Sequence, residues 1–224
     1  MSASRRTAFA LAGALLAALP ASVQAGDPDA ADPLAERNVV GTVEDANRRY
    51  AATTDGVFAL AAETGRVMWR AAAGTHTFTP TLDADGDRLW GGTRDGALLL
   101  LAADTGAVLR QRGFPGWVYS PALTGGQAIT GGRAATVWAL DQASGEITWQ
   151  RGLGQEMVGP AVALDGDAAA VATFDGRVRV FDAGDGTLRW SARLTSAPKA
   201  LLAAGERVLV LDFAGAITAL TTAD

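Results

Sequence analysis

Clustered carboxylates are the first feature of this sequence that could do chemistry. Asp83, Asp85 and Asp87 stand at alternate positions around Gly86, a spacing that is typical of loops that bind Ca²⁺. Such a loop also needs glycine at its sixth position and glutamate at its twelfth position. Arginine occupies both of these places, so the stretch is predicted to be a hairpin turn without a metal ion.

Histidine and cysteine are nearly absent, which excludes several classes of site. His76 is the single histidine, so a Ser-His-Asp triad or a multi-histidine metal site would depend on one side chain. The chain has no cysteine, which excludes thiolate nucleophiles, iron–sulfur sites, cysteine-ligated zinc and disulfides. We predict no catalytic residue and no metal site, and hence a protein that is not an enzyme.

These residues lie within a repeat of about 40 residues. Each copy has a short apolar run, with an Asp-Gly or similar turn before it and a Thr-Gly or Ser-Gly turn after it. The copies are Asp55–Trp69, Asp95–Gly106, Thr136–Trp149, Asp175–Trp190 and the fragment Ala214–Leu220. A period of this size predicts an all-β fold, a β-propeller of about five repeats with four-stranded antiparallel blades.

The propeller is predicted to span residues 39–224, in units of about 39–78, 79–119, 120–158, 159–197 and 198–224. In the second unit we expect strands at 79–83, 88–92, 97–102 and 107–111. The fifth unit has only three strands. A five-bladed ring closed by a strand at about 27–35 is preferred, although two prolines make that strand poor. The alternatives are a homodimer that completes a larger ring, and a truncated relative of a longer propeller.

The recurring turn glycines and tryptophans are predicted to serve the fold. Glycine after aspartate tolerates the positive φ of a tight hairpin, and a large ring on the outermost strand covers the adjacent blade. Arg110 stands where the second repeat should have tryptophan, which predicts a weaker contact there. The structural set is Gly56, Gly65, Trp69, Gly96, Gly106, Gly145, Trp149, Gly176, Gly186 and Trp190.

The N-terminus predicts export. Arg5 and Arg6 precede an apolar run that ends in a small-residue cleavage site, so residues 1–25 are predicted to be a secretory signal peptide. A Pro/Asp-rich segment, residues 26–38, follows. The apolar run is too short for a transmembrane anchor, so we expect a periplasmic or secreted protein. The net charge of −5 and the absence of a Lys/Arg cluster argue against nucleic acid as a partner.

Aromatic, Met and Arg residues gather in the loops at one end of the predicted blades, a composition typical of interaction surfaces. The alternative is that the aromatic residues plug the funnel of the ring. The candidate partner-binding rim is His76, Phe78, Arg94, Phe114, Trp117, Tyr119 and Met157.

The pattern Ala-Leu-x-x-x-(Thr/Ser)-Gly-x-x-x-Trp, present at Ala59–Trp69 and Ala139–Trp149, resembles the pyrroloquinoline-quinone (PQQ) propeller repeat. The resemblance extends from about residue 39 to residue 220. It implies kinship with quinone-dependent dehydrogenases and with a cofactor-free scaffold of the outer-membrane assembly machinery. The dehydrogenases have longer chains, many carry a vicinal cysteine pair, and their inserted calcium-binding loop is not recognisable here. The non-catalytic branch is therefore the better match.

Together these features predict an exported, non-catalytic scaffold of the cell envelope that binds a protein or an extended peptide without a cofactor. The alternative is a PQQ-binding protein or a reduced relative of the quinoprotein dehydrogenases, with Arg94 and Trp117 nearest to the quinone. A sugar-binding propeller is a third interpretation and has no motif of its own.

Overall fold

The computed structural model describes residue 34 and residues 37–221, except 73 and 206. The predicted signal peptide, nearly all of the 26–38 segment and the proposed closing strand at 27–35 lie outside this part of the chain. Every regular element among the described residues is a β-strand, and the strands form five antiparallel sheets. We call these sheets blades 1 to 5. No helix in the described part of the chain is long and apolar enough to cross a membrane.

Blades 1 to 4 are four-stranded meanders, and each strand pairs with the one before it in the chain. Blade 1 contains β1 (Val39–Glu44), β2 (Arg48–Thr53), β3 (Gly56–Ala61) and β4 (Val67–Ala71). Blade 2 contains β5 (Thr81–Leu82), β6 (Arg88–Gly92), β7 (Ala97–Ala102) and β8 (Val108–Gly113). Blade 3 contains β9 (Ala122–Thr124), β10 (Gln127–Gly131), β11 (Thr136–Asp141) and β12 (Ile147–Gly152).

Blade 4 contains β13 (Val162–Leu164), β14 (Ala168–Ala172), β15 (Arg177–Asp182) and β16 (Leu188–Arg193). Blade 5 contains three strands, β17 (Pro198–Ala204), β18 (Arg207–Asp212) and β19 (Ile217–Thr221). The first strands of blades 2 and 3 begin directly after Pro80 and Pro121, since proline cannot donate to a strand ladder. The all-β propeller architecture is confirmed.

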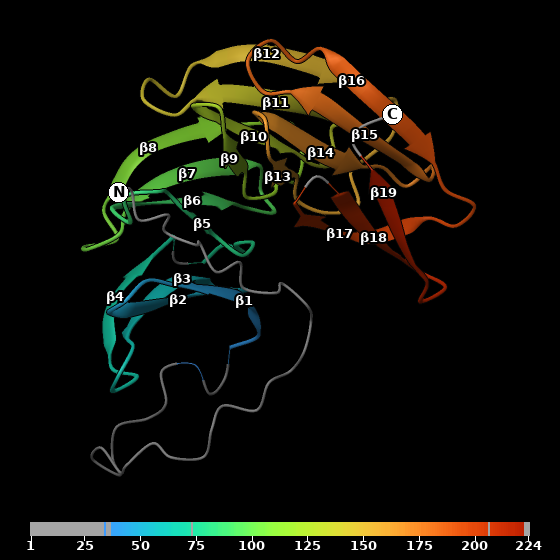
Figure 1. The fold of residues 1–224 in the computed structure, drawn as a ribbon. Coiled ribbons are helices and arrows are strands. Elements are labelled where there is room, and N and C mark those ends of the chain that lie inside the picture. The colour runs from blue at the N-terminus through green and yellow to red at the C-terminus, as the bar shows by residue number, and fades with distance from the viewer. Residues whose placement is uncertain (1–33, 35–36, 73, 206, 222–224) are drawn as a thin grey trace, which may run out of the picture.

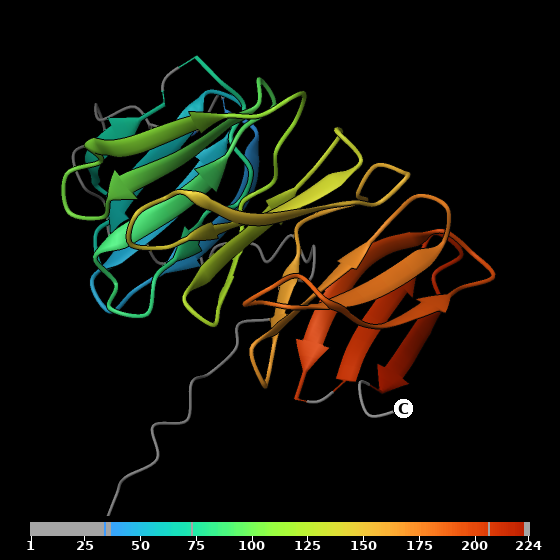
Figure 2. The same cartoon turned by 90° about the horizontal axis from the view of Figure 1, so that it is seen from above.

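The blades follow one another along an arc, with blade 1 at one end and blade 5 at the other (Figure 1). No strand of blade 1 pairs with a strand of blade 5 among the described residues. None of the apolar clusters among the described residues joins blade 1 to blade 5 either, so the described blades do not form the predicted closed five-bladed ring, and the proposed closing strand lies outside them. Figure 2 shows the same succession of sheets from above.

Each of the four interfaces between neighbouring blades holds one apolar cluster. Leu101 of blade 2 packs with Tyr50 of blade 1, and Trp138 of blade 3 packs in the cluster that contains Trp90. Between blades 3 and 4, Ile129 shares a cluster with Val171. Alanine residues on the central strands let the sheets approach closely, as the alanine-rich β14 shows. The hydrophobic core is thus a series of inter-blade seams rather than one central core.

A latch links the outermost strand of each of the first three blades to the next blade. The indole Nε1 of Trp69 donates to the carbonyl oxygen of Ala103 (3.0 Å), and that of Trp149 donates to Ala183 (2.8 Å). In blade 2, Arg110 makes the equivalent bond from Nη1 to the carbonyl oxygen of Ala143 (3.1 Å). The substitution therefore keeps the latch, which we had expected to be weaker at this place.

The turn glycines of the structural set have the conformation that their sequence context predicts. Gly106 and Gly186 adopt φ of 71° and 69°, in the left-handed region. They also lie under a tryptophan ring, since a Cβ atom at either position would be 2.5 Å from the ring of Trp69 or Trp149. Glycine is needed at these turns both for the backbone angle and for the close approach of the ring.

Candidate functional site

The turn between the second and third strands lies at the same end of every blade and carries one side chain that points outward. Blades 1, 2 and 4 carry the sequence Thr-x-Asp-Gly at this turn. In blade 2 the Thr93 hydroxyl accepts a hydrogen bond from the backbone N–H of Ala97 (2.8 Å) and donates one to the Asp95 carboxylate. That bond holds the pKa of Asp95 below its ordinary value. The residue between Thr and Asp is left exposed by this turn. The equivalent residues, called here the turn series, are Thr54, Arg94, Arg133, Phe174 and Phe213.

The loop that leads into each blade supplies a second side chain beside the first. The backbone N–H of each turn-series residue donates to a carbonyl oxygen of this loop, at distances from 3.0 to 3.2 Å. The same bond in every blade identifies equivalent positions despite different loop lengths. These positions, called the loop series, are Asn38, His76, Trp117, Glu156 and Ala197. The two series together make up the rim.

The centre of the rim is a stack of charged and aromatic groups across three blades. The guanidinium carbon of Arg94 lies 3.9 Å from the centre of the Trp117 ring, and that of Arg133 lies 4.4 Å from it. Arg133 also forms an ion pair with Glu156 (Nη1–Oε2, 2.5 Å). Contacts of a cation with an indole face contribute about 0.5–2 kcal/mol each, depending on exposure. Contacts with two guanidinium groups thus fix the orientation of the Trp117 ring.

Only one of the two arginines in this stack has an ion-pair partner among the described residues. Glu156 neutralises Arg133, whereas Arg94 has no ion pair with any described residue. Arg94 is exposed, so its charge is available to a partner. The central rim therefore offers a net positive charge beside an aromatic ring on a protein whose total charge is negative.

His76 lies at the edge of this stack and carries a shifted pKa. Burial, and then the charge of Arg94, hold the pKa of His76 below its usual range. A folded-state pKa below the unfolded value means that the unfolded chain binds more protons as the pH falls. Stability linked to His76 is therefore complete above about pH 6.5 and decreases as the pH falls below that value.

Replacing Arg94 with methionine is expected to raise the pKa of His76, because one of its two depressing causes is removed. The shift is measured from the imidazole resonances of His76 in an NMR titration. Arg112→Met, which removes an arginine from another part of the same blade, is the control and should leave the titration unchanged. An unchanged pKa in Arg94→Met contradicts the assigned contact.

Four of the predicted rim residues meet in one aromatic cluster. The Phe78 ring lies 5.4 Å from His76, 6.2 Å from Trp117 and 4.7 Å from Tyr119 between ring centres. Trp117 and His76 reach the surface, whereas Tyr119 is 8% exposed. Tyr119 is buried in the seam between blades 3 and 4, whereas Trp117 lies on the rim, and partner binding by the rim stays a prediction.

Arg94 belongs to the stack, and the remaining two predicted rim residues, Phe114 and Met157, lie elsewhere. Phe114 packs against Trp138, with ring centres 4.8 Å apart, in the seam between blades 2 and 3. Met157 is fully buried against Gly131, so its prediction as a surface contact is wrong. Met157 directly follows Glu156 in extended chain, where successive side chains point to opposite sides. Glu156 takes the outward place and Met157 the inward one.

Sequence reasoning did not select Arg133 and Glu156. The turn of blade 3 reads Gly-Arg-Ala-Ala and lacks the Asp-Gly pair that marks the turns of blades 1, 2 and 4. Ala135 adopts φ of 52° in place of glycine, so the turn keeps its shape. Alignment of the repeats by strand register, rather than by turn residues, would have placed Arg133 beside Arg94.

The carboxylates at residues 83–87 form a hairpin turn, as predicted. The Asp83 carboxylate accepts the backbone N–H of Asp87 (3.0 Å) and the side chain of Arg88 (2.7 Å). These bonds occupy the oxygens that a cation would need. Within the described ranges, no group of three or more His, Cys, Asp or Glu side chains is arranged to hold a metal ion.

The repeat and the rim can now be compared with known proteins. The protein-family model described as "Outer membrane protein assembly factor BamB" matches residues 53–200 and 133–224. The chain belongs to this family of PQQ-like repeat propellers. The outer membrane protein assembly factor BamB of Xanthomonas campestris pv. campestris is 29% identical over 144 residues, which cover 60% of this chain and 36% of that protein.

Solved structures share the fold. The crystal structure of BamB from Moraxella catarrhalis aligns with a TM-score of 0.66 at 22% identity, over 82% of this chain and 57% of that one. The computationally designed Ika8 protein aligns with a TM-score of 0.72 at 18% identity, over 82% of this chain and 58% of its own. The chain therefore spans less than two thirds of the length of each of these relatives.

Proposed function

We propose that this protein is an exported, non-catalytic scaffold of the cell envelope, and that its rim binds a protein component of the outer-membrane assembly machinery. The observation that carries this proposal is the stack of Arg94, Trp117 and Arg133. Tryptophan and arginine are the residues most often responsible for binding energy in protein interfaces. Membership of the BamB family supplies the setting.

The form of the rim suits an extended partner segment. One turn-series and one loop-series residue recur per blade, so the binding groups follow the arc in a row. An extended peptide presents side chains at regular intervals and can meet several of them in turn. Arg94 adds a cation that selects against basic segments.

The alternative of a PQQ-binding protein is disfavoured by the same stack. A flat quinone near Arg94 and Trp117 needs an open indole face, and two guanidinium groups already lie over this ring, 3.9 and 4.4 Å from its centre. Binding would require the displacement of one arginine from its contact. We therefore propose that the protein works without PQQ. A homodimer that completes a larger ring remains a prediction, which light scattering tests.

The test is affinity capture from cell envelopes in which the tagged chain is crosslinked to its neighbours. We expect a component of the outer-membrane assembly machinery to be enriched by the wild-type chain and lost with Arg94→Glu, which reverses the exposed charge. Ser144→Glu, at the opposite end of blade 3, is the matched control and should retain the partner. No enrichment by a folded, exported chain contradicts the proposal, as does saturable quenching of tryptophan fluorescence by micromolar PQQ.

A further inference from the structure

One position on the rim lacks the side chain that its equivalents provide. The loop series places His76, Trp117 and Glu156 in the successive slots between blades, but Ala197 in the slot between blades 4 and 5. The loop has the same length there, since Leu194 precedes Ala197 by three residues just as Phe114 precedes Trp117, and the N–H groups of Leu194 and Phe114 make the equivalent backbone bond to the turn glycine. The chain itself therefore leaves this slot without a large group.

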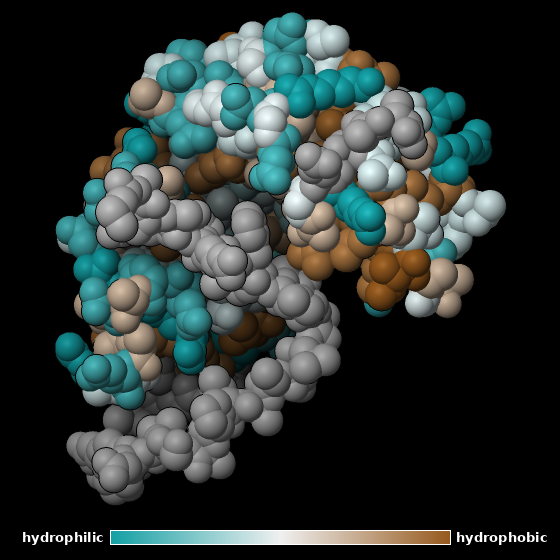
Figure 3. Space-filling model, viewed as in Figure 1, coloured by the Kyte–Doolittle hydropathy of each residue, from teal (hydrophilic) through white to brown (hydrophobic). Residues whose placement is uncertain are grey.

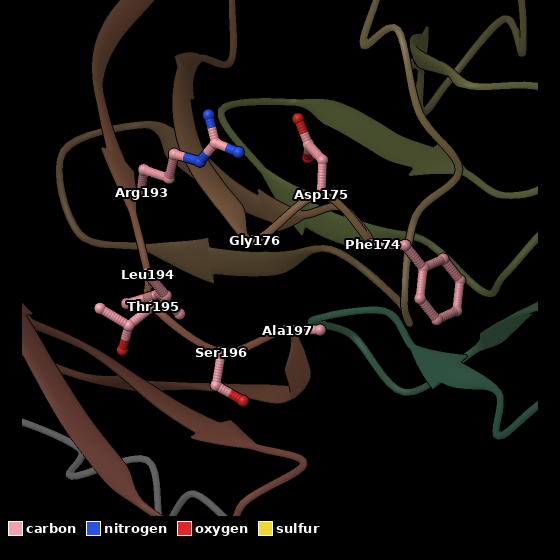
Figure 4. A pocket seen from close by; sticks show the side chains of 8 residues that line it. All are labelled: Phe174, Asp175, Gly176, Arg193, Leu194, Thr195, Ser196 and Ala197. Atoms are coloured by element: carbon pink, nitrogen blue, oxygen red, sulfur yellow. The ribbon is translucent and has the colours of Figure 1, made fainter.

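A depression marks the slot (Figure 4). It is lined by Phe174, Asp175 and Gly176 from the turn of blade 4 and by residues 193–197 from the loop that leads into blade 5. The backbone is more open here than in blade 2. A Cβ atom on Gly96 would lie 2.6 Å from the carbonyl oxygen of Gly116, whereas one on Gly176 would have its nearest neighbour, the Leu194 carbonyl oxygen, at 3.1 Å.

Two exposed phenylalanines of the turn series stand next to the slot, since Phe174 lines the depression and the backbone N–H of Phe213 donates to the carbonyl oxygen of Ala197. Phe174 is 41% exposed and Phe213 is 62% exposed. Within the described residues, neither ring packs against another aromatic ring, and Phe174 has only Arg133 near its face, at 6.0 Å. Hydrophobic surface gathers at the end of the arc where β17–β19 lie (Figure 3).

We propose that this slot binds an aromatic side chain carried by the extended partner segment, an inference that rests on the proposed function. The filled slot between blades 2 and 3 is the precedent. There, the Trp117 ring is held by Arg94 from the preceding turn and by Arg133 from the turn of its own blade. In the vacant slot the corresponding residues are Phe174 and Phe213.

Aromatic rather than acidic side chains fit this position. Phenylalanine rings favour offset or edge-to-face contact with another ring, and Arg193 in the lining can stack on it as Arg94 stacks on Trp117. The carboxylate of Asp175, also in the lining, disfavours an acidic side chain. An aliphatic side chain can bury less area against the two rings and gains no cation–π contact.

The test uses isotope-labelled protein and short peptides of serine and glycine that carry one central tryptophan, leucine or aspartate. We expect the tryptophan peptide to shift the amide resonances of Phe174, Ala197 and Phe213 saturably. The leucine peptide should bind about tenfold more weakly, and the aspartate peptide should give no saturable shift. Phe174→Ser, which removes an exposed ring, should lower the affinity for the tryptophan peptide by about tenfold.

The decisive variant fills the slot with a side chain of the protein itself. Ala197→Trp supplies the ring that the loop lacks and should abolish the shifts. Ala214→Trp adds the same ring at an exposed position of the blade 5 turn that does not line the depression, and should leave binding intact. If Ala197→Trp does not fold, Phe174→Ser alone decides.

The proposal is overturned if a folded wild-type chain gives no saturable shift with the tryptophan peptide, or equal shifts with all three peptides. Capture from envelopes by wild type is run in parallel. Partner capture without peptide binding would contradict the aromatic slot and support the scaffold function. Peptide binding without partner capture would support the aromatic slot and contradict the scaffold function.

Discussion

Replacing Trp149 with alanine is expected to lower the free energy of unfolding by about 3–5 kcal/mol. The ring is 6% exposed, covers Gly186 of the next blade, and donates from Nε1 to the carbonyl oxygen of Ala183 at 2.8 Å. Its removal opens a cavity in the seam between blades 3 and 4 and leaves that carbonyl without its donor. Urea unfolding followed by circular dichroism measures the loss.

Trp190 is the matched control because it occupies the same place in the repeat with fewer contacts. Its Nε1 is buried and has no hydrogen-bond partner among the described residues, and its ring is more exposed than that of Trp149. We expect Trp190→Ala to cost about 1–2 kcal/mol. Equal losses for the two variants would show that the latch bond and the seam do not account for stability.

The second large effect is expected at the rim, where Trp117 and Tyr119 have different roles although a single residue, Val118, lies between them. Trp117→Ala should reduce partner capture at least about tenfold, because it removes the ring on which both arginines stack. Its cost to the free energy of unfolding should stay near 1–2 kcal/mol, since the ring is only half-buried.

Tyr119→Ala should behave in the opposite way. This ring is 8% exposed and packs on Phe78 with centres 4.7 Å apart, so its loss is expected to cost about 3–4 kcal/mol. Tyr119→Phe keeps the ring and should be close to wild type in both measurements. If Trp117→Ala unfolds the chain as readily as Tyr119→Ala, Trp117 is a plug and not a partner contact.

Much of the fold could be predicted because the turn residues of each repeat mark where its strands begin and end. In the second unit the strands expected at 88–92 and 97–102 match β6 and β7, since Asp-Gly and Thr-Gly turns bound them. The first strand is shorter than expected because Pro80 cannot pair. The curvature of the arc could not be predicted, because it depends on how neighbouring sheets pack.

The candidate site was predictable only in part for a related reason. Aromatic and arginine residues in the loops predicted the end of the blades at which the Arg94, Trp117 and Arg133 stack lies. Which loop residue faces outward depends on a register of one residue, and that register separates Glu156 from Met157. Arg110 in place of Trp predicts a weaker contact, yet arginine reaches the equivalent carbonyl of the next blade because its side chain is long and rich in donors.

The central claim is that the rim, rather than the opposite end of the blades, meets the partner. The most direct test places a photo-crosslinking amino acid at Thr54 or Phe174 on the rim, and at Ser144 or Asp185 at the opposite end. All four side chains are exposed, so the fold should tolerate each change apart from Phe174 losing its own ring. We predict that irradiation of cells joins one envelope protein to the two rim positions and not to the other two. Adducts from Ser144 and Asp185, with none from Thr54 and Phe174, would contradict the claim.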